Sequence, residues 1–311
     1  MKNNSNTDNS LLFANFKFRC HRLGDLMTNL PGLSDAETKK LNILVQRDKD
    51  SKIGKAKDLT ENMKEDLKEL IIKRDKPDSL PIGAKSYLDD VFDEIFWRRK
   101  RLLGNKYLDK GLMNEQDVLA IHSQIDNVTY FKNYTRFYND YLEGTPDVVV
   151  DKIVKDAKAN YDLESFRKAH LSTGYLWQLK GYLWLTKLKQ AELMYGLVNN
   201  PLHQINNAIT STFYALGCPA DDDDTFIKAK MQIERNMIFD HRLFTEEYPN
   251  YVYQNPVLDF DMPPILRVKK YDVFLEDSDI VNMKSRVLLS RLYLCEKEIA
   301  VRKLDGSLII K

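Results

Sequence analysis

The sequence predicts an α/β (α+β) fold in which a central mixed β-sheet is flanked by helices. Two apolar, β-branched runs, Val148–Val150 and Ile153–Val154, flank Asp151-Lys152, which is typical of two strands joined by a tight hairpin. The segment Tyr175–Leu185 is apolar almost all round and therefore predicts a buried helix. Strand-like segments follow at 191–198 and 265–275. This order of hairpin, helices and strands indicates a mixed sheet with helices packed against it.

A two-residue turn at Asp151-Lys152 determines the strand register. Counting back from the turn, Val148 faces Lys155 and Asp147 faces Asp156. Two carboxylates in such positions repel unless something positive lies between them. The period-2 alternation of a strand places Lys158 on the same face as Asp156. The pattern therefore predicts two carboxylates and an ammonium at one point, a set that suits Mg²⁺ or Mn²⁺, unless the hairpin is exposed and carries scattered surface charges.

Size and composition are those of an ordinary soluble protein. The chain has 311 residues, of which 43% are hydrophobic and 30% charged. We expect a disordered tail at 1–10 and one domain over 11–311, with a helical N-terminal insertion and a C-terminal strand–helix extension. The helix of that extension covers Asp277–Val301. No internal repeat divides this range.

Charge and cysteine content exclude several classes of protein. The formal net charge of +1 provides no overall basic field for nucleic acid, although a local groove can still be basic. The cysteines Cys20, Cys218 and Cys295 are far apart, which argues against disulfides and against cysteine-based zinc or iron–sulphur sites. The polar N-terminus lacks the apolar run of a signal peptide, and no segment has the length of a membrane span. A reducing cytoplasm is the expected location.

A third carboxylate lies on a predicted helix over Asp109–His122. On a helical wheel Glu115 falls among apolar residues, at a position that is unfavourable for a charge unless the side chain is paired, binds a cation or reaches water at the rim. On the helix at 175–185, Gln178 and Tyr182 are four residues apart and share a face. Once buried, both need hydrogen-bond partners, either each other, nearby backbone or a site.

Other charged segments allow two interpretations. Arg19 lies where a short extended piece turns into a helix, a place that can hold a phosphate but is more often ordinary surface. The run Arg98–Arg101 is either a solvated helix end or a set of phosphate contacts. The acidic run Asp221–Asp224 is better interpreted as a solvated loop than as a metal cluster.

Several of these residues together resemble one family. Gly144-Thr145-Pro146-Asp147, then Asp156-Ala157-Lys158, then Gln178-x-x-x-Tyr182 is similar to the core of the PD-(D/E)XK nucleases. The most similar group is the YqaJ-type, lambda-exonuclease-like viral recombination nucleases. In that group a helix resembling Lys110–Glu115 supplies an extra metal-binding glutamate. The resemblance covers most of 15–305 and implies a restriction-endonuclease-like core.

The resemblance implies a role for each matching residue. Glu115, Asp147 and Asp156 would bind the divalent metal, Mg²⁺ or Mn²⁺, with the Ala157 carbonyl as a further ligand. Lys158 would position or activate the attacking water and balance charge on the phosphate. The nucleic-acid-binding residues would be Arg19, Gln178 and Tyr182, the last two either steadying the site or touching the nucleic acid. His21 and Arg22 stand where the family often has small hydroxyl residues, a departure that concerns the pocket for the terminal phosphate.

The function implied is Mg²⁺-dependent hydrolysis of phosphodiester bonds from duplex DNA ends, 5′ to 3′, in phage-type recombination or repair. Two alternatives stay open: an endonuclease on the same core, and a non-catalytic DNA-binding or interaction protein that keeps the fold. The resemblance also implies a single-strand annealing protein as partner and a homo-oligomeric ring, while the lack of a long apolar run predicts no membrane.

Overall fold

The computed structural model describes residues 11–28, 33, 35–75, 79–100, 114–217, 223–254 and 261–304. The chain divides into two compact units, one of residues 1–16, 25–99 and 278–311, and the other of residues 17–24 and 100–277. The predicted single domain over 11–311 stays a prediction, because two such units can fold together. The predicted tail at 1–10 lies outside the described residues.

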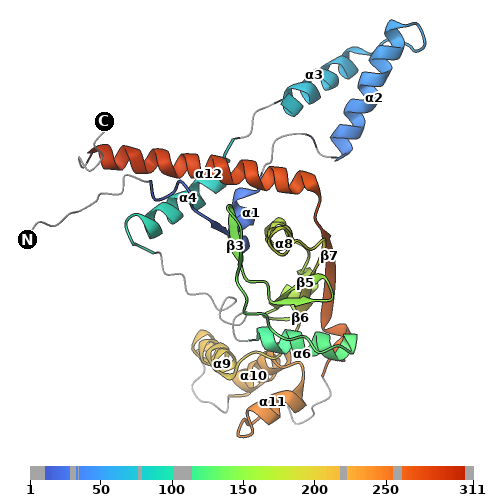
Figure 1. Cartoon of the computed structure of the whole chain (residues 1–311). Coiled ribbons are helices and arrows are strands. Elements are labelled where there is room, and N and C mark those ends of the chain that lie inside the picture. Colours follow the sequence, from blue (N-terminus) through green and yellow to red (C-terminus); the bar gives the residue numbers. More distant parts are fainter. Residues whose placement is uncertain are drawn as a thin grey trace, which may run out of the picture. The chain divides into compact units, whose positions relative to one another are not determined.

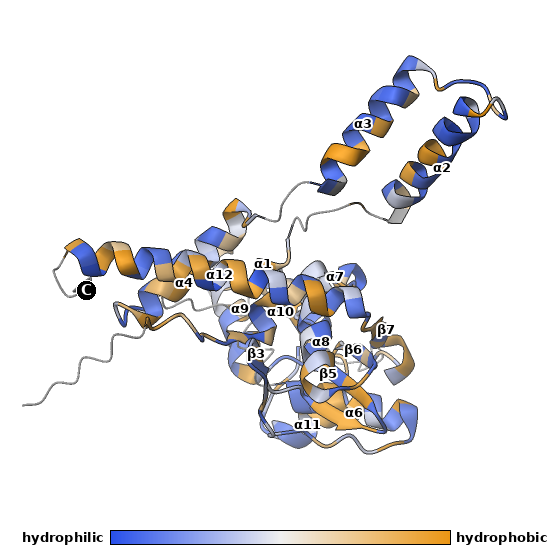
Figure 2. Cartoon of the chain, turned by 45° about the horizontal axis from the view of Figure 1, so that its top comes forward, coloured by the Kyte–Doolittle hydropathy of each residue, from blue (hydrophilic) through white to orange (hydrophobic). Residues whose placement is uncertain are grey.

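The first unit is helical in the residues described. Helices α2 (Asp35–Lys52) and α3 (Glu61–Asp75) pack through four buried leucines, namely Leu41, Leu44, Leu59 and Leu70. Both helices are otherwise largely hydrophilic (Figure 2). Helix α4 (Ile82–Ile95) contacts α12 (Asp277–Leu304), where Asp89 accepts hydrogen bonds from Tyr293 Oη at 2.8 Å and Lys297 Nζ at 2.6 Å. Helix α12 lies where the sequence predicts the last helix, and the description of the N-terminal helices as an insertion stays a prediction.

The second unit contains a four-stranded mixed sheet with the order β4-β5-β6-β7 (Figure 1). Its strands are β4 (Val148–Val150), β5 (Ile153–Ala159), β6 (Gln190–Gly196) and β7 (Val268–Phe274). Strand β5 is antiparallel to β4 and parallel to β6, while β7 is antiparallel to β6. The parallel pair requires a crossover, which α7 (Leu163–Lys168) and α8 (Thr173–Thr186) provide. The predicted mixed sheet is therefore confirmed.

Two helices cover opposite faces of this sheet. Helix α6 (Glu115–Asp126) packs on the face of Ala157 and Met194, with Val118 and Leu119 buried in the shared core. Helix α8 packs on the other face, the face of Asp156. A hydrogen bond of 3.0 Å between His122 Nε2 and the Tyr195 carbonyl oxygen ties α6 to β6. The sheet is thus buried on both sides, as a strand pair joined by a crossover requires.

A smaller sheet lies beside it, with the order β1-β3-β2. Its strands are β1 (Phe18–Arg19), β2 (Phe137–Tyr138) and β3 (Leu142–Gly144). Strand β1 leads directly into a 3₁₀ turn, η1 (Cys20–Arg22), and α1 (Leu23–Leu26), as predicted for an extended piece turning into a helix. Strand β3 leads into β4 and so brings Asp147 to the edge of the main sheet.

The remaining elements of the second unit form a separate helical cluster. Helices α9 (Leu202–Leu216), α10 (Asp224–Met237) and α11 (His241–Glu247) surround a core of Ile205, Met237, Ile238 and Phe244. A second 3₁₀ turn, η2 (Pro264–Leu266), precedes β7. Asp223 caps α10 through the N–H groups of Thr225 and Phe226, so this part of the acidic run has a structural role. Asp221 lies outside the described residues.

Candidate active site

The hairpin has the predicted register. Val148 pairs with Lys155 and Val150 with Ile153 across β4 and β5. The two turn residues both have positive φ angles, 47° at Asp151 and 67° at Lys152. Two positive φ values in a two-residue loop match the right-handed twist of the strands, although neither residue is the usual glycine or asparagine. Continued by one residue, this register places Asp147 opposite Asp156.

The two aspartates and the lysine come together in the structure. The backbone N–H of Ala157 donates to Asp147 Oδ2 at 2.8 Å, which holds this carboxylate against β5. Lys158 Nζ lies 2.5 Å from Asp156 Oδ2. Asp156 is almost fully buried, whereas Asp147 and Lys158 are only half-buried and open toward solvent. The predicted cluster of two carboxylates and an ammonium is therefore present.

The charges in this cluster perturb one another. Burial, reinforced by the charge of Asp156, raises the pKa of Asp147 to about 8, although Lys158 opposes the shift. Burial alone would lower the pKa of the Lys158 ammonium, but Asp156 and Asp147 outweigh it and raise that pKa. One carboxylate is thus disfavoured as an anion while the lysine is held as a cation. A raised lysine pKa suits a fixed positive charge beside a phosphate better than a proton acceptor.

Helix α8 contributes the side chain that hydrogen-bonds to the buried Asp156. Gln178 Nε2 donates to Asp156 Oδ1 at 3.0 Å and to Tyr182 Oη at 3.1 Å. Both side chains are buried, which favours the steadying role over direct contact with nucleic acid. Gly144 allows this packing, because a Cβ there would lie 2.6 Å from Tyr182 Cε1. Gly144 packs against Tyr182, and Asp147 follows Gly144 by three residues, so the same short segment contacts α8 and carries the first aspartate.

Glu115 is the first residue of α6 and interacts electrostatically with Asp147. Its Oε2 atom accepts from Lys132 Nζ at 2.6 Å, while Oε1 is buried and has no hydrogen-bond partner among the described residues. Helix α6 approaches the sheet closely at Gly196, where a Cβ would lie 2.9 Å from Val118. The small residue therefore determines how near the sheet the Glu115 end of α6 can lie.

Three residues near the cluster were not singled out from the sequence. Lys132 holds Glu115, and the backbone N–H of Asn133 donates to the Asp147 carbonyl oxygen at 2.6 Å. The ring of Tyr175 lies 5.1 Å from Lys158 Nζ, within cation–π range. Tyr175 precedes Gln178 by three residues, so helical spacing could have identified it. No sequence pattern links Lys132 to Glu115, since a loop separates them.

Arg19 lies apart from this network. It ends β1 with an exposed side chain, and its backbone neighbour is Glu143 on β3. Among the described residues, no hydrogen bond or ion pair joins Arg19 to the carboxylates. Cys20, the next residue, has a thiol pKa raised by burial and by Glu143, so it serves as a packed, unreactive side chain. The phosphate-binding role of Arg19 stays a prediction.

The donor set fits a hard divalent cation. Among the described residues, no three carboxylate, imidazole or thiol side chains lie close enough together to hold a metal as they stand. Mg²⁺, however, commonly binds to one or two carboxylates and completes its shell with water and substrate oxygens. Asp147, Asp156 and the Ala157 carbonyl provide such a set. The orphaned Glu115 Oε1 atom would gain a partner if that side chain turned toward the ion.

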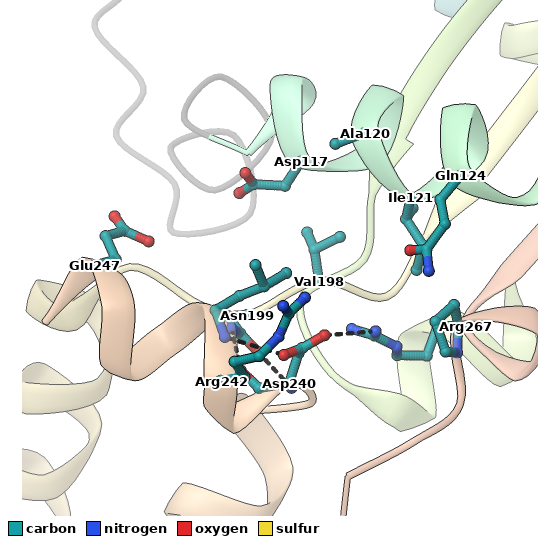
Figure 3. A pocket seen from close by; sticks show the side chains of 12 residues that line it. Asp117, Ala120, Ile121, Gln124, Val198, Asn199, Asp240, Arg242, Glu247 and Arg267 are labelled. Atoms are coloured by element: carbon teal, nitrogen blue, oxygen red, sulfur yellow. Dashed lines mark hydrogen bonds and ion pairs between the residues drawn. The ribbon is translucent and has the colours of Figure 1, made fainter. Parts of the chain in front are cut away.

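A pocket elsewhere in the same unit does not contain these residues (Figure 3). Its volume is about 450 Å³, and its wall comes mainly from α6, α11 and η2. Buried Arg267 pairs with Asp240 at 3.0 Å, and Asn199 Nδ2 donates to the Asp240 carbonyl oxygen at 2.8 Å. Asp240 and its partners Asn199 and Arg267 thus hold one another in place, as the dashed lines in Figure 3 mark. The pocket has no counterpart of the Asp147, Asp156 and Lys158 cluster, because no lysine is among its lining residues.

Comparison with known proteins identifies solved structures of similar fold. No family model matches the chain, and no curated protein matches its sequence. Among solved structures, the chain resembles exonucleases. A phage-related exonuclease from Haemophilus somnus 129PT superposes with a TM-score of 0.56 at 19% identity, covering 92% of this chain and 97% of that one. The alkaline exonuclease LHK-Exo from Laribacter hongkongensis gives 0.50 at 9% identity, covering 94% and 95%. The resemblance to lambda-exonuclease-like nucleases is confirmed at the level of fold.

No helix in the described part of the chain combines the length and apolar character that crossing a membrane requires.

Proposed function

We propose that this protein is a Mg²⁺-dependent DNA exonuclease that hydrolyses phosphodiester bonds from the ends of duplex DNA. The observation that carries the proposal is the convergence of Asp147, Asp156 and Lys158, with Glu115 in electrostatic range of Asp147. With Lys132, which pairs with Glu115, this set has one more carboxyl group than it has ammonium groups, and a divalent cation would stabilise all three carboxyl groups as anions. Two solved structures that resemble this chain in fold are exonucleases, which supports this choice among metal-dependent reactions.

The side chains have distinct parts in such a reaction. A cation bound by Asp147, Asp156 and the Ala157 carbonyl would stabilise charge on the phosphate and lower the pKa of a bound water. Lys158 supplies a fixed positive charge where negative charge develops on the phosphate oxygens. Gln178 keeps the Asp156 carboxylate in one orientation through its 3.0 Å hydrogen bond. A ligand held by a neighbouring amide loses less entropy when the cation binds.

Purified protein incubated with Mg²⁺ and linear duplex DNA tests the proposal. We expect metal-dependent loss of the linear duplex and no cleavage of covalently closed circular DNA of the same sequence. Digestion of the circle at a similar rate would replace the exonuclease by an endonuclease on the same core. Absence of any metal-dependent hydrolysis would leave only the non-catalytic alternative.

Two variants connect the activity to the cluster. Asp156→Ala and Lys158→Ala should each abolish hydrolysis, while Asp272→Ala provides a matched control, since Asp272 is exposed on the same sheet at β7. Unimpaired hydrolysis by either cluster variant would sink the assignment of the site. Circular dichroism would show whether each variant is folded.

Several finer predictions depend on the resemblance alone. These are the 5′ to 3′ polarity, the role in phage-type recombination or repair, a single-strand annealing partner and a ring-shaped homo-oligomer. The cytoplasmic location, which the scattered cysteines favour, is likewise a proposal. DNA labelled at either the 5′ or the 3′ terminus would test the polarity, because release of the 5′ label first is the expected result. Light scattering of the purified protein would test the oligomer.

A further inference from the structure

The segment at 127–139, between α6 and β3, is unusually rich in aromatic residues. It contains two cations, Lys132 and Arg136, no acidic residue, and five aromatic residues, namely Tyr130, Phe131, Tyr134, Phe137 and Tyr138. Three of the rings face solvent, with exposed fractions of 78% for Phe131, 78% for Tyr134 and 68% for Tyr138. Large aromatic side chains exposed together near a site mark an interaction surface.

The backbone of this segment is anchored to the carboxylate cluster. The Asn133 N–H donates to the Asp147 carbonyl oxygen at 2.6 Å, and Asn133 Nδ2 donates to the Pro146 carbonyl oxygen at 2.9 Å. Lys132 is bonded to Glu115. Phe131 and Tyr134 immediately flank these two residues, and consecutive Cα atoms are only about 3.8 Å apart. The backbone that carries Phe131 and Tyr134 is therefore held beside the cluster.

A cation accompanies one of the three exposed rings. Lys17 Nζ lies 4.4 Å from the centre of the Tyr138 ring, so a cation accompanies this aromatic face. The two cations within the segment are paired with carboxylates, Arg136 with Glu143 and Lys132 with Glu115. The exposed rings themselves therefore carry the argument, because bases of single-stranded nucleic acid stack on aromatic side chains without regard to sequence.

We propose that Phe131, Tyr134 and Tyr138 form a stacking surface for unpaired bases at a DNA end. This inference depends on the proposed function for its substrate class. Bases inside a duplex have both faces covered by their neighbours, so an aromatic ring can stack only on a terminal or unpaired base. A surface of this kind beside the cluster would hold the end of one strand after it separates from its complement. It would make the enzyme prefer frayed or single-stranded ends.

Binding in EDTA separates this surface from catalysis. The probe is fluorescein-labelled oligothymidylate of about 20 nucleotides, and the readout is fluorescence anisotropy with the full chain. Phe131→Ala and Tyr134→Ala should each weaken binding about 10-fold, and the double variant about 100-fold. Tyr134→Phe should bind like the wild type because it keeps the ring, whereas Tyr134→Leu should not. Tyr214→Ala is the matched control, since Tyr214 is 76% exposed on α9.

The outcomes separate the two proposals. Affinity for the oligonucleotide within two-fold of wild type in the folded double variant would overturn the stacking surface, as would equal weakening in Tyr214→Ala. Equal binding by Tyr134→Leu and Tyr134→Phe would overturn it too, because apolar bulk rather than a ring would then suffice. If the protein hydrolyses no DNA with Mg²⁺ but binds the oligonucleotide through these rings, the nuclease proposal fails and the stacking surface stands.

Discussion

Two lysine–carboxylate pairs lie three residues apart on β5 and on opposite faces of the sheet. On the α8 face, Lys158 Nζ is 2.5 Å from Asp156 Oδ2. On the α6 face, Lys155 Nζ is 2.5 Å from Glu192 Oε1 on the neighbouring strand β6. The Lys155 ammonium is also covered by the Tyr130 ring, 4.8 Å away. The contact distances are the same, but the surroundings differ.

The difference lies in the balance of charge. Lys155 and Glu192 neutralise each other, and their side chains are only 7% and 15% exposed, so this pair is a closed structural contact. Around Lys158 the carboxylates of Asp156, Asp147 and Glu115 outnumber the ammonium groups of Lys158 and Lys132 by one. The lysine with excess carboxylates is the candidate catalytic residue. A short lysine–carboxylate contact alone does not identify a site.

The largest expected effect is on the rate of DNA hydrolysis, which should depend on Lys158 and not on Lys155. Lys158→Met should reduce the rate of DNA hydrolysis about 10³-fold, because it removes a fixed charge next to the phosphate. The double variant Lys155→Met/Glu192→Leu should keep nearly full activity. Initial rates on linear duplex DNA with saturating Mg²⁺ measure both. Equal losses in the two variants would break the distinction between the faces.

The second prediction concerns stability, for which Lys155 should matter more than Lys158. Lys155→Ala should lower the free energy of unfolding by about 3–5 kcal/mol, because it leaves Glu192 as a buried charge without its partner. Lys155→Met/Glu192→Leu removes both charges and should restore most of that loss. Urea denaturation followed by circular dichroism provides the comparison. If the single and double variants were equally unstable, the closed-pair interpretation would be wrong.

A smaller effect tests how α8 supports the site. Gln178→Leu should reduce kcat about 10-fold, since Asp156 loses the hydrogen bond that orients it. The DNA dissociation constant measured in EDTA should change little, because Gln178 is buried. Gln178→Asn shortens the side chain and serves as a comparison that retains the amide. A large loss of DNA affinity with unchanged kcat would instead indicate direct contact with nucleic acid.

The smallest effect is a pH dependence of the metal-free protein. The pKa of Asp147 is raised from 3.8 to about 8, so the folded state holds a proton that the unfolded state releases. This contribution to stability is fully present below pH 4 and is lost as the pH rises toward 8. The measurement is the difference in melting temperature between the wild type and Asp147→Asn in EDTA. As the pH rises from 5 to 8, the melting temperature of the wild type should drop by about a few degrees relative to that of the variant. Mg²⁺ should reverse the fall, since a bound cation favours the carboxylate.

The hairpin is a part of the structure that local sequence patterns predict correctly. The β-branched runs on either side of Asp151-Lys152 predict the register that the structure has, and with it the opposition of Asp147 and Asp156. The limits of α9 were also predictable, because its apolar periodicity ends at Gly217, which adopts the left-handed conformation that caps a helix. In both places short-range geometry decides the outcome.

Contacts across loops were not predictable in this way. Lys132 and Glu115 are separated by most of α6 and an irregular segment, so no periodicity relates them. Helix α11 has no clear local signal either, because its sequence lies next to the stretch 248–264, whose tyrosines and prolines favour irregular structure. The pairing of Lys155 with Glu192 depends on which strand lies parallel to β5, and the long crossover leaves that choice to tertiary packing.

The sequence by itself determined the hairpin, the register and therefore the identity of the clustered acids, because a turn and a period of two act within a few residues. Tertiary structure decided which charges are balanced. It brought Glu192 to Lys155, Gln178 to Asp156, and Lys132 to Glu115, each from a different element. Burial then shifted the pKa values of Asp147 and Lys158, because the energy of a charge depends on the solvent and neighbours that only the folded chain specifies.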